Sequence, residues 1–345
     1  MKRSTTDKNI IKVGRIQYVN VAPVYYGLEQ DDAPANIQLV RKPPAVLNHM
    51  MEQGLIDISP VSSAAFARNH HQWSLLPNLS ISSFGTVMSV ILASNYPLEK
   101  LNKRKILLSN ESASAADMLR LVLSWKNIFP RFETGSVTSD THATYAGYDA
   151  VLVIGNNALS GGWHHRFQYG FDLGELWKEA TGLPFVFAVW AVRKAFAGQH
   201  PIIVTEIARH FEHSKRLGMR NIDKIEAMAC ASLDMDPEDC RTYFQILKYG
   251  LGHFELLGLK KFYQGLYEEK IISAPVKLSF FPTLIDGEKS EHEVPAESSE
   301  EKSIAEAAPV SRQKSALLNL GLRHLPLPLK KVFPQLLHLL RQDRQ

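Results

Sequence analysis

Short apolar segments alternate with amphipathic segments along most of the chain, and this alternation limits the possible folds. The segments expected to form strands are 13–18, 37–41, 55–58, 86–93, 106–108, 132–137, 150–154 and 185–192. The segments expected to form helices are 24–29, 45–53, 62–68, 114–128 and 172–180, followed by a helical region from residue 200 to about 272. The pattern predicts an α/β fold with a mostly parallel sheet and helices on both faces.

Composition narrows the class of protein. The chain has 345 residues, of which 45% are hydrophobic and 21% charged, as in ordinary globular proteins. A net charge of +4 gives no support to a nucleic-acid binder, which would carry a basic stripe. The two cysteines, Cys230 and Cys240, fit neither a disulfide framework nor a metal pattern, and we expect reduced structural thiols and no metal site.

The start of the chain lacks the features of an export signal. Residues 1–12 are basic, but the apolar run of about 7–15 residues that a signal peptide needs does not follow. No segment approaches the roughly 18 consecutive apolar residues of a membrane span. We therefore expect a cytoplasmic protein without a transmembrane segment.

The last 60 residues differ from the body. Residues 286–303 carry seven acidic and two basic side chains and almost nothing apolar, which is typical of a disordered linker. Residues 317–340 are rich in leucine and basic, and three prolines interrupt them. We expect 285–345 to form a low-order tail whose segment 317–340 docks on the body, binds a partner or contacts a membrane surface.

Small polar residues follow three of the expected strands. They occupy residues 59–63, 109–114 and 155–157, where each strand passes into a helix. Such junctions place backbone N–H groups and hydroxyls at the carboxyl ends of strands, where open α/β sheets bind ligands. Helix capping alone explains any one junction. The three together favour a site for a small anion.

The residues show no standard catalytic motif, because the sequence lacks the nucleophile elbow, zinc-protease, dinucleotide and phosphate-loop patterns. The adjacent pairs His70-His71 and His164-His165 are expected on the surface, and Trp125, Trp177 and Trp190 in the core or the cleft wall. From the residues alone, the chain is interpreted as a two-lobed α/β ligand-binding protein.

Four blocks resemble a known enzyme family. They are 14–25 (GRIQYVNVAPVY), 54–63 (GLIDISPVSS), 84–94 (FGTVMSVILAS) and 172–190, which begins DLGELWK. Over about residues 10–280 the chain resembles the chorismate dehydratase family (MqnA) of the futalosine route to menaquinone. The sister family of the same pathway is expected to carry Ser-Pro-Cys-Pro-Asn-Asp-Thr after the first strand, where this chain has YVNVAP.

The resemblance implies a two-lobed fold like that of type II periplasmic binding proteins, with the ligand in the cleft between the lobes. Residues 1–94 and 190–284 would form the first lobe, and 95–189 the second. The implied reaction is loss of water from chorismate, giving 3-[(1-carboxyvinyl)oxy]benzoate, without a cofactor. In this family the substrate's enolpyruvyl carboxylate is thought to act as the base.

The resemblance also implies site residues. Asn20 matches the family's key asparagine and Ser89 a serine of the cleft block, and both are expected to be catalytic. Ser112 and Ser114 match a Ser-x-Thr-Ser run expected to hold a substrate carboxylate. The remaining residues expected to bind substrate are Tyr18, Ser59, Ser62, Gly155 and Asn156.

Two positions depart from the family pattern. Asn156 stands where the family usually has aspartate, and Ala115 where the serine run ends in serine. The dehydratase is the expected function, and two alternatives stay open beside it. One is a non-catalytic binding protein for a small organic anion, which the fold permits. The other is an inactive family member with an interaction role, which the departures at Asn156 and Ala115 support.

Overall fold

The computed structural model describes residues 10–30, 36–138, 140, 145–160 and 162–282. The chain divides into one compact unit, residues 1–284, and a second unit, residues 285–345. The tail expected at 285–345, with its segment 317–340, lies outside the described residues.

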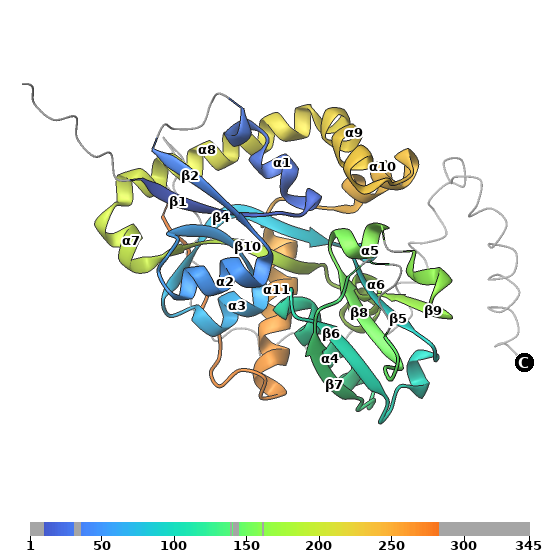
Figure 1. Ribbon diagram of the computed structural model, residues 1–345. Coiled ribbons are helices and arrows are strands. Elements are labelled where there is room, and N and C mark those ends of the chain that lie inside the picture. Colours follow the sequence, from blue (N-terminus) through green and yellow to red (C-terminus); the bar gives the residue numbers. More distant parts are fainter. Residues whose placement is uncertain (1–9, 31–35, 139, 141–144, 161, 283–345) are drawn as a thin grey trace, which may run out of the picture. The chain divides into compact units, whose positions relative to one another are not determined.

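The described residues form two five-stranded sheets (Figure 1). The first sheet has the spatial order β2 (Ile37–Lys42), β1 (Ile11–Ile16), β3 (Ile58–Ser62), β10 (Phe185–Arg193) and β4 (Trp73–Ser83). The second has the order β7 (Arg131–Gly135), β6 (Lys105–Ser109), β8 (Ala150–Ile154), β5 (Val90–Ser94) and β9 (Tyr169–Asp172). The two sheets are the centres of two α/β lobes, as expected from the sequence.

The expectation of a mostly parallel sheet is wrong, because each sheet has two parallel and two antiparallel strand pairs. Strand β1 pairs in parallel with β2 and β3, and β6 does so with β7 and β8. Strand β10 runs antiparallel to β3 and β4, and β5 runs antiparallel to β8 and β9. Every residue of β8 is buried, which explains its unbroken apolar sequence, because an inner strand is covered on both faces.

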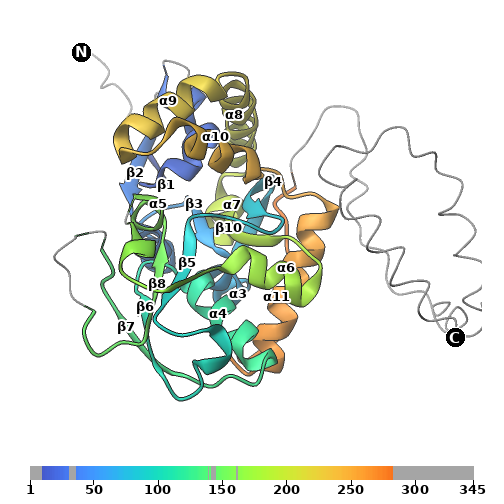
Figure 2. The ribbon, with the colours of Figure 1, turned by 90° about the vertical axis from the view of Figure 1, so that its right-hand side faces the viewer.

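Helices cover both faces of the first sheet. Figure 1 shows α1 (Ala22–Tyr25) and α8 (Pro201–Arg220) on one face and α2 (Pro44–Glu52) and α3 (Ser63–Asn69) on the other. Figure 2 shows α11 (His253–Glu268) running past α3 and also past α4 (Ala113–Trp125) of the second lobe. Helix α11 therefore packs on both lobes.

The remaining helices complete the two lobes. They are α5 (Asn156–Ser160) and α6 (Leu173–Thr181) in the second lobe, and α7 (Lys194–Gln199), α9 (Ile222–Leu233) and α10 (Pro237–Ile246) in the first. An aromatic cluster joins the lobes, since the Trp177 ring of α6 contacts Phe185 of β10 and Phe262 of α11. Trp177 and Trp190 are fully buried, as expected for core residues.

The chain passes between the lobes twice, at positions that differ from the expected ones. It leaves the first sheet after Ser83 and returns at Phe185. The expected boundaries, 94/95 and 189/190, therefore fall at the end of a second-sheet strand and inside a first-sheet strand. The run 86–93 is not one strand, because Met88 has a φ of 60° and β5 begins only at Val90.

Candidate functional site

A pocket lies between the lobes, where the carboxyl ends of β1 and β3 face the loops of the second lobe. Its cavity volume is about 60 Å³. Polar lining residues are Tyr18, Asn20, Ser62, Ser89, Ser112 and Gly155; apolar lining residues are Ile16, Pro44, Ile81, Val87, Val90, Ile154, Phe187 and Ala188. Six of the nine predicted site residues thus lie around one cavity.

Asn20 enters the pocket from the short 3₁₀ turn Val19–Val21 that follows β1. Its Oδ1 atom is buried and accepts no hydrogen bond from any described residue. A buried acceptor without a donor costs free energy, about 1–3 kcal/mol. A ligand that donates a hydrogen bond in the pocket would remove this cost.

Ser89 lies on the first crossing between the lobes and is buried. Its carbonyl accepts a hydrogen bond from Gly155 N at 2.8 Å. The two residues before Ser89 are held by Asp172, whose carboxylate accepts from Val87 N and, at 2.7 Å, from Met88 N. The crossing that carries Ser89 is therefore fixed to the second lobe on both sides.

Asp172 also begins helix α6, because the same carboxylate accepts from Gly174 N and Glu175 N. Burial raises the pKa of Asp172, and the four backbone N–H groups oppose that rise. A Cβ atom at Gly174 would lie 2.1 Å from the Gly85 carbonyl oxygen, so only glycine allows the helix to approach the crossing this closely. The DLG sequence thus holds the crossing in place.

Tyr18 spans the lobes. Its hydroxyl donates to Glu111 Oε2 at 2.5 Å, and its ring rests on Gly155, where an added Cβ would come within 2.7 Å. Burial, followed by the hydrogen bond to the Glu111 carboxylate, raises the pKa of Tyr18 above its usual range, so the phenol stays protonated. Sequence reasoning missed Glu111, because an acidic residue in an expected anion-binding junction carried no positive signal.

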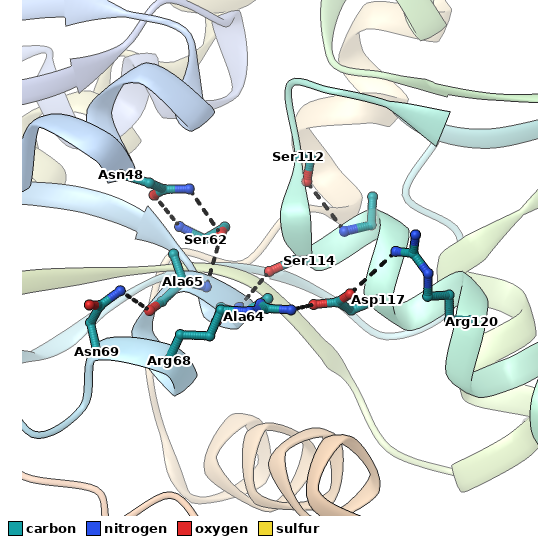
Figure 3. A network of polar contacts seen from close by, with 11 residues as sticks. Asn48, Ser62, Ala64, Ala65, Arg68, Asn69, Ser112, Ser114, Asp117 and Arg120 are labelled. Carbon is teal, nitrogen blue, oxygen red and sulfur yellow. Dashed lines mark hydrogen bonds and ion pairs between the residues drawn. The ribbon is translucent and has the colours of Figure 1, made fainter. Parts of the chain in front are cut away.

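Ser62 ends β3 and caps α3, where its Oγ accepts from Ala65 N at 3.2 Å. The buried amide of Asn48 on α2 donates to the same Oγ at 3.2 Å and accepts from Ser62 N at 3.1 Å (Figure 3). Asn48 was not among the predicted residues. A buried asparagine within an otherwise apolar helix face was the signal that could have found it.

Ser112 and Ser114 have different roles in the structure. Ser112 caps α4 by accepting from Ala115 N at 3.3 Å, and it lines the pocket. Ser114 is absent from the lining, because its Oγ accepts from Ala64 N of α3 at 2.9 Å and its side chain is buried. Contrary to the prediction of a substrate ligand, Ser114 links the two lobes (Figure 3).

Ser59 and Asn156 also lie outside the pocket lining. Ser59 is fully buried in β3 and donates to the Pro60 carbonyl at 2.9 Å. The expected strand ended at residue 58, whereas β3 continues to Ser62, so Ser59 lies inside the strand and not at its end. Asn156 Oδ1 accepts from Val19 N at 3.3 Å, a bond that the family's aspartate would also make.

The second departure, Ala115, does not face the pocket. Its side chain is 1% exposed and belongs to the hydrophobic core. A serine at this position would need a partner within the core. The absent hydroxyl therefore removes no described group from the cavity.

The lining is electrically neutral. It contains no Asp, Glu, His, Lys or Arg, and its only titratable side chain is the protonated Tyr18. Among the described residues, no group of three His, Cys, Asp or Glu side chains could hold a metal ion, and no described helix is long and apolar enough to cross a membrane. The pocket offers hydroxyl and amide groups beside an apolar wall, which suits a ring with polar substituents.

The lobes are close together around this pocket. A cavity volume of 60 Å³ is well below the roughly 300 Å³ at which ligand pockets begin. Ion pairs and hydrogen bonds cross from one lobe to the other, including Tyr18 to Glu111 and Arg68 to Asp117 at 2.6 Å. A ring-sized ligand therefore needs more room than the pocket has in this structure.

Solved structures share this two-lobed fold. A protein from Archaeoglobus fulgidus matches with a TM-score of 0.62 at 17% identity, covering 77% of this chain and all of that one. The aliphatic sulphonate binding protein SsuA from Escherichia coli matches with a TM-score of 0.56 at 14% identity, covering 84% of this chain and 98% of that one. The fold is that of the periplasmic binding proteins.

Relatives found by sequence similarity indicate a narrower family than the shared fold does. A chorismate dehydratase from Thermus thermophilus is 28% identical over 269 residues, covering 74% of this chain and 94% of the relative. A chorismate dehydratase from Campylobacter jejuni is 25% identical over 254 residues, covering 72% of this chain and 94% of the relative. The family model for menaquinone biosynthesis matches residues 11–268, so the chain belongs to this menaquinone biosynthesis family.

Proposed function

We propose that the protein is a chorismate dehydratase, a lyase that converts chorismate to 3-[(1-carboxyvinyl)oxy]benzoate and water. The observation that carries the proposal is the buried, unpartnered Oδ1 of Asn20 inside the pocket of a family member. Two relatives that match over most of the chain are chorismate dehydratases. The ring hydroxyl of chorismate is a donor that Oδ1 could accept from.

The pocket suits the substrate's shape and polarity. Its apolar wall, which includes Phe187 and Ile154, would contact the carbocyclic ring. The hydroxyls of Ser62, Ser89 and Ser112 would donate to carboxylates and oxygen atoms at its edge. Hydrogen bonds to charged groups contribute about 1.5–3 kcal/mol each, so a few fixed donors are enough to hold a dianion.

The neutral lining favours a base supplied by the substrate. The reaction removes the ring hydrogen next to the departing hydroxyl, and an enzyme base must lie within hydrogen-bond reach of that hydrogen. Tyr18, the only titratable side chain of the lining, stays protonated because burial raises its pKa. The carboxylate of Glu111 contacts the Tyr18 hydroxyl but is absent from the lining, so we assign the base to the enolpyruvyl carboxylate of chorismate itself. It takes the ring proton while the C–O bond to hydroxide breaks and the ring becomes aromatic.

The protein's contribution in this scheme is orientation. Asn20 and Ser89 come from different lobes, so both reach the substrate only when the lobes close over it. Closure would hold the carboxylate against the ring hydrogen and exclude water. Fixed geometry and preorganised donors of this kind lower barriers by several kcal/mol.

Incubation with chorismate tests the proposal. Purified protein, treated with a chelator and supplied with no nucleotide, should form 3-[(1-carboxyvinyl)oxy]benzoate, detected by chromatography. Heat-denatured protein is the control. Binding of chorismate without any product would refute the dehydratase and favour the second candidate.

The second candidate is a non-catalytic binding protein for a small organic anion. The same neutral lining of hydroxyls and amide groups would serve such a receptor, since no titratable group is needed for binding. An inactive family member with an interaction role is a third possibility. It would bind chorismate weakly or not at all, so the same incubation separates the three.

A cytoplasmic location and a reaction without a cofactor are part of the proposal. A role for residues 317–340 in contacting a partner or a membrane surface stays a prediction. Removing residues 285–345 and measuring turnover tests whether the tail affects the body.

A further inference from the structure

The hydrogen bonds around Ser62 fix the direction of its hydroxyl. Both side chains are buried, since Ser62 is 3% exposed and Asn48 is 7% exposed. Two donors reach Ser62 Oγ at 3.2 Å, namely Asn48 Nδ2 and Ala65 N (Figure 3). A serine hydroxyl has two lone pairs and one proton, and here both lone pairs are occupied.

The orientation of the Asn48 amide is fixed as well. Its Oδ1 accepts from Ser62 N at 3.1 Å, so a flipped amide would place N–H against N–H on this side. Nδ2 must therefore face Ser62 Oγ, where it can only donate. The one remaining hydrogen-bonding group of the Ser62 side chain is its proton, and no described residue accepts it.

Ser62 lines the pocket, so a ligand atom is the available acceptor. We propose that Asn48 is a positioning residue that makes Ser62 an obligate hydrogen-bond donor to a carboxylate of the substrate. The inference rests on the proposed function for the identity of that substrate. It adds a determinant of specificity, because a ligand N–H placed at Ser62 would meet only another donor.

Ser112 provides the contrast within the same pocket. Its Oγ accepts one described hydrogen bond, from Ala115 N. The second lone pair stays open, so this hydroxyl can donate to a ligand or accept from it. Of these two serines, Ser62 is the one whose polarity the surrounding protein determines.

The substitution Asn48→Asp reverses the arrangement with almost no change in shape. The new carboxylate still accepts from Ser62 N, and its second oxygen accepts the Ser62 proton. Ser62 then presents a lone pair to the pocket. The probe is benzene-1,3-dicarboxylate, an aromatic dianion without a hydroxyl to lose, and its neutral diamide is the matched ligand with N–H donors.

Calorimetric titration of four proteins forms a double-mutant cycle: wild type, Asn48→Asp, Ser62→Ala and the double variant. We expect Ser62→Ala and Asn48→Asp each to weaken dicarboxylate binding about 10-fold or more, the scale of one hydrogen bond to a charged group. In the Ser62→Ala background, Asn48→Asp should add less than about threefold, because the hydroxyl it acts through is gone. The diamide should lose much less affinity than the dicarboxylate.

Four results would overturn the inference. These are an unchanged affinity in Asn48→Asp, the same loss with and without the Ser62 hydroxyl, an equal loss for both ligands, and no dicarboxylate binding by the wild type. If Asn48→Asp does not fold, Asn48→Leu removes the donor without adding charge and should weaken the dicarboxylate less than Ser62→Ala does. No loss in Asn48→Leu would overturn the inference. If the cycle gives the expected affinities but the protein does not convert chorismate, the proposed dehydratase activity is refuted and the inference about Asn48 and Ser62 stands.

Discussion

Replacing Asp172 by alanine should loosen the crossing between the lobes and destabilise the fold. One carboxylate there accepts four backbone hydrogen bonds, two from the start of α6 and two from Val87 and Met88. Losing the helix cap costs about 0.5–2 kcal/mol. Of the two crossing residues, Val87 is buried and Met88 half-buried, so the loss of their acceptor adds about 1–3 kcal/mol. We expect a total loss of about 2–5 kcal/mol in the free energy of unfolding.

Urea denaturation and thermal melting measure this loss. For a body of this size, each kcal/mol corresponds to about 2–4 °C in melting temperature, so Asp172→Ala should melt about 5–15 °C below the wild type. Affinity for the dicarboxylate should also fall, because Ser89 directly follows Met88 on the released crossing. Asp172→Asn keeps one acceptor oxygen, so its melting temperature should lie between those of the wild type and Asp172→Ala.

Asp236 provides the matched control. It caps α10 by accepting from Glu238 N, is exposed, and makes no described contact with the crossing. Asp236→Ala should lose only about 1 kcal/mol, the value of a cap, and keep its affinity. If Asp172→Ala melts no lower than Asp236→Ala, Asp172 does not hold the crossing and our explanation of the DLG sequence is wrong.

Three further predictions concern the same body. Gly155→Ala places a Cβ against the ring of Tyr18 and should reduce turnover. The control Gly182→Ala changes a glycine with the same left-handed backbone, but its Cβ would contact no other residue, so turnover should stay at the wild-type rate. Equal rates in the two variants would show that the contact between Tyr18 and Gly155 does not matter for turnover. Ser114→Ala should lower the free energy of unfolding, measured by urea denaturation, by about 1–3 kcal/mol and leave the ligand affinity unchanged. A changed affinity would indicate that Ser114 contacts the ligand after all. Burial raises the pKa of Tyr25, so the stability that the neutral phenol contributes is present below about pH 10 and is lost as the pH rises above that value. The urea midpoint of the wild type should therefore fall between about pH 9 and about pH 11, and Tyr25→Phe should make this fall smaller. An equal fall in the wild type and the variant would contradict this explanation.

The sequence predicted the two-lobed fold because its inner strands are short, apolar and separated by helices. It missed β4, whose run is interrupted by Pro77 and by Asn78 with a φ of 55°. Proline and a left-handed residue at these positions interrupt the alternation of apolar and polar side chains that identifies a strand in a sequence. The segment is recognised as one strand only from its pairing with β10. Strand β9 was missed because its four residues are too short for a pattern.

The candidate site was predicted in part, for a similar reason. Motif positions identified Asn20, Ser62 and Ser89, which lie at the ends of elements and face the pocket. Ser114 has the same residue type and nearly the same position as Ser112, and only the approach of α3 decides that its hydroxyl bonds to Ala64 N. Contacts between lobes depend on residues about 50 or more positions apart, which spacing along the chain does not reveal.

Turnover of chorismate by matched asparagine variants tests the central claim most directly. Asn20 lines the pocket with a buried, unpartnered acceptor, whereas Asn110 is exposed and absent from the lining. We predict that the wild type and Asn110→Ala form the enolpyruvyl benzoate at similar rates, and that Asn20→Ala is slower by about 100-fold or more while still folded. A wild type that forms no product, or an Asn20→Ala variant within about twofold of the wild type, would contradict the proposed function or the role of Asn20, respectively.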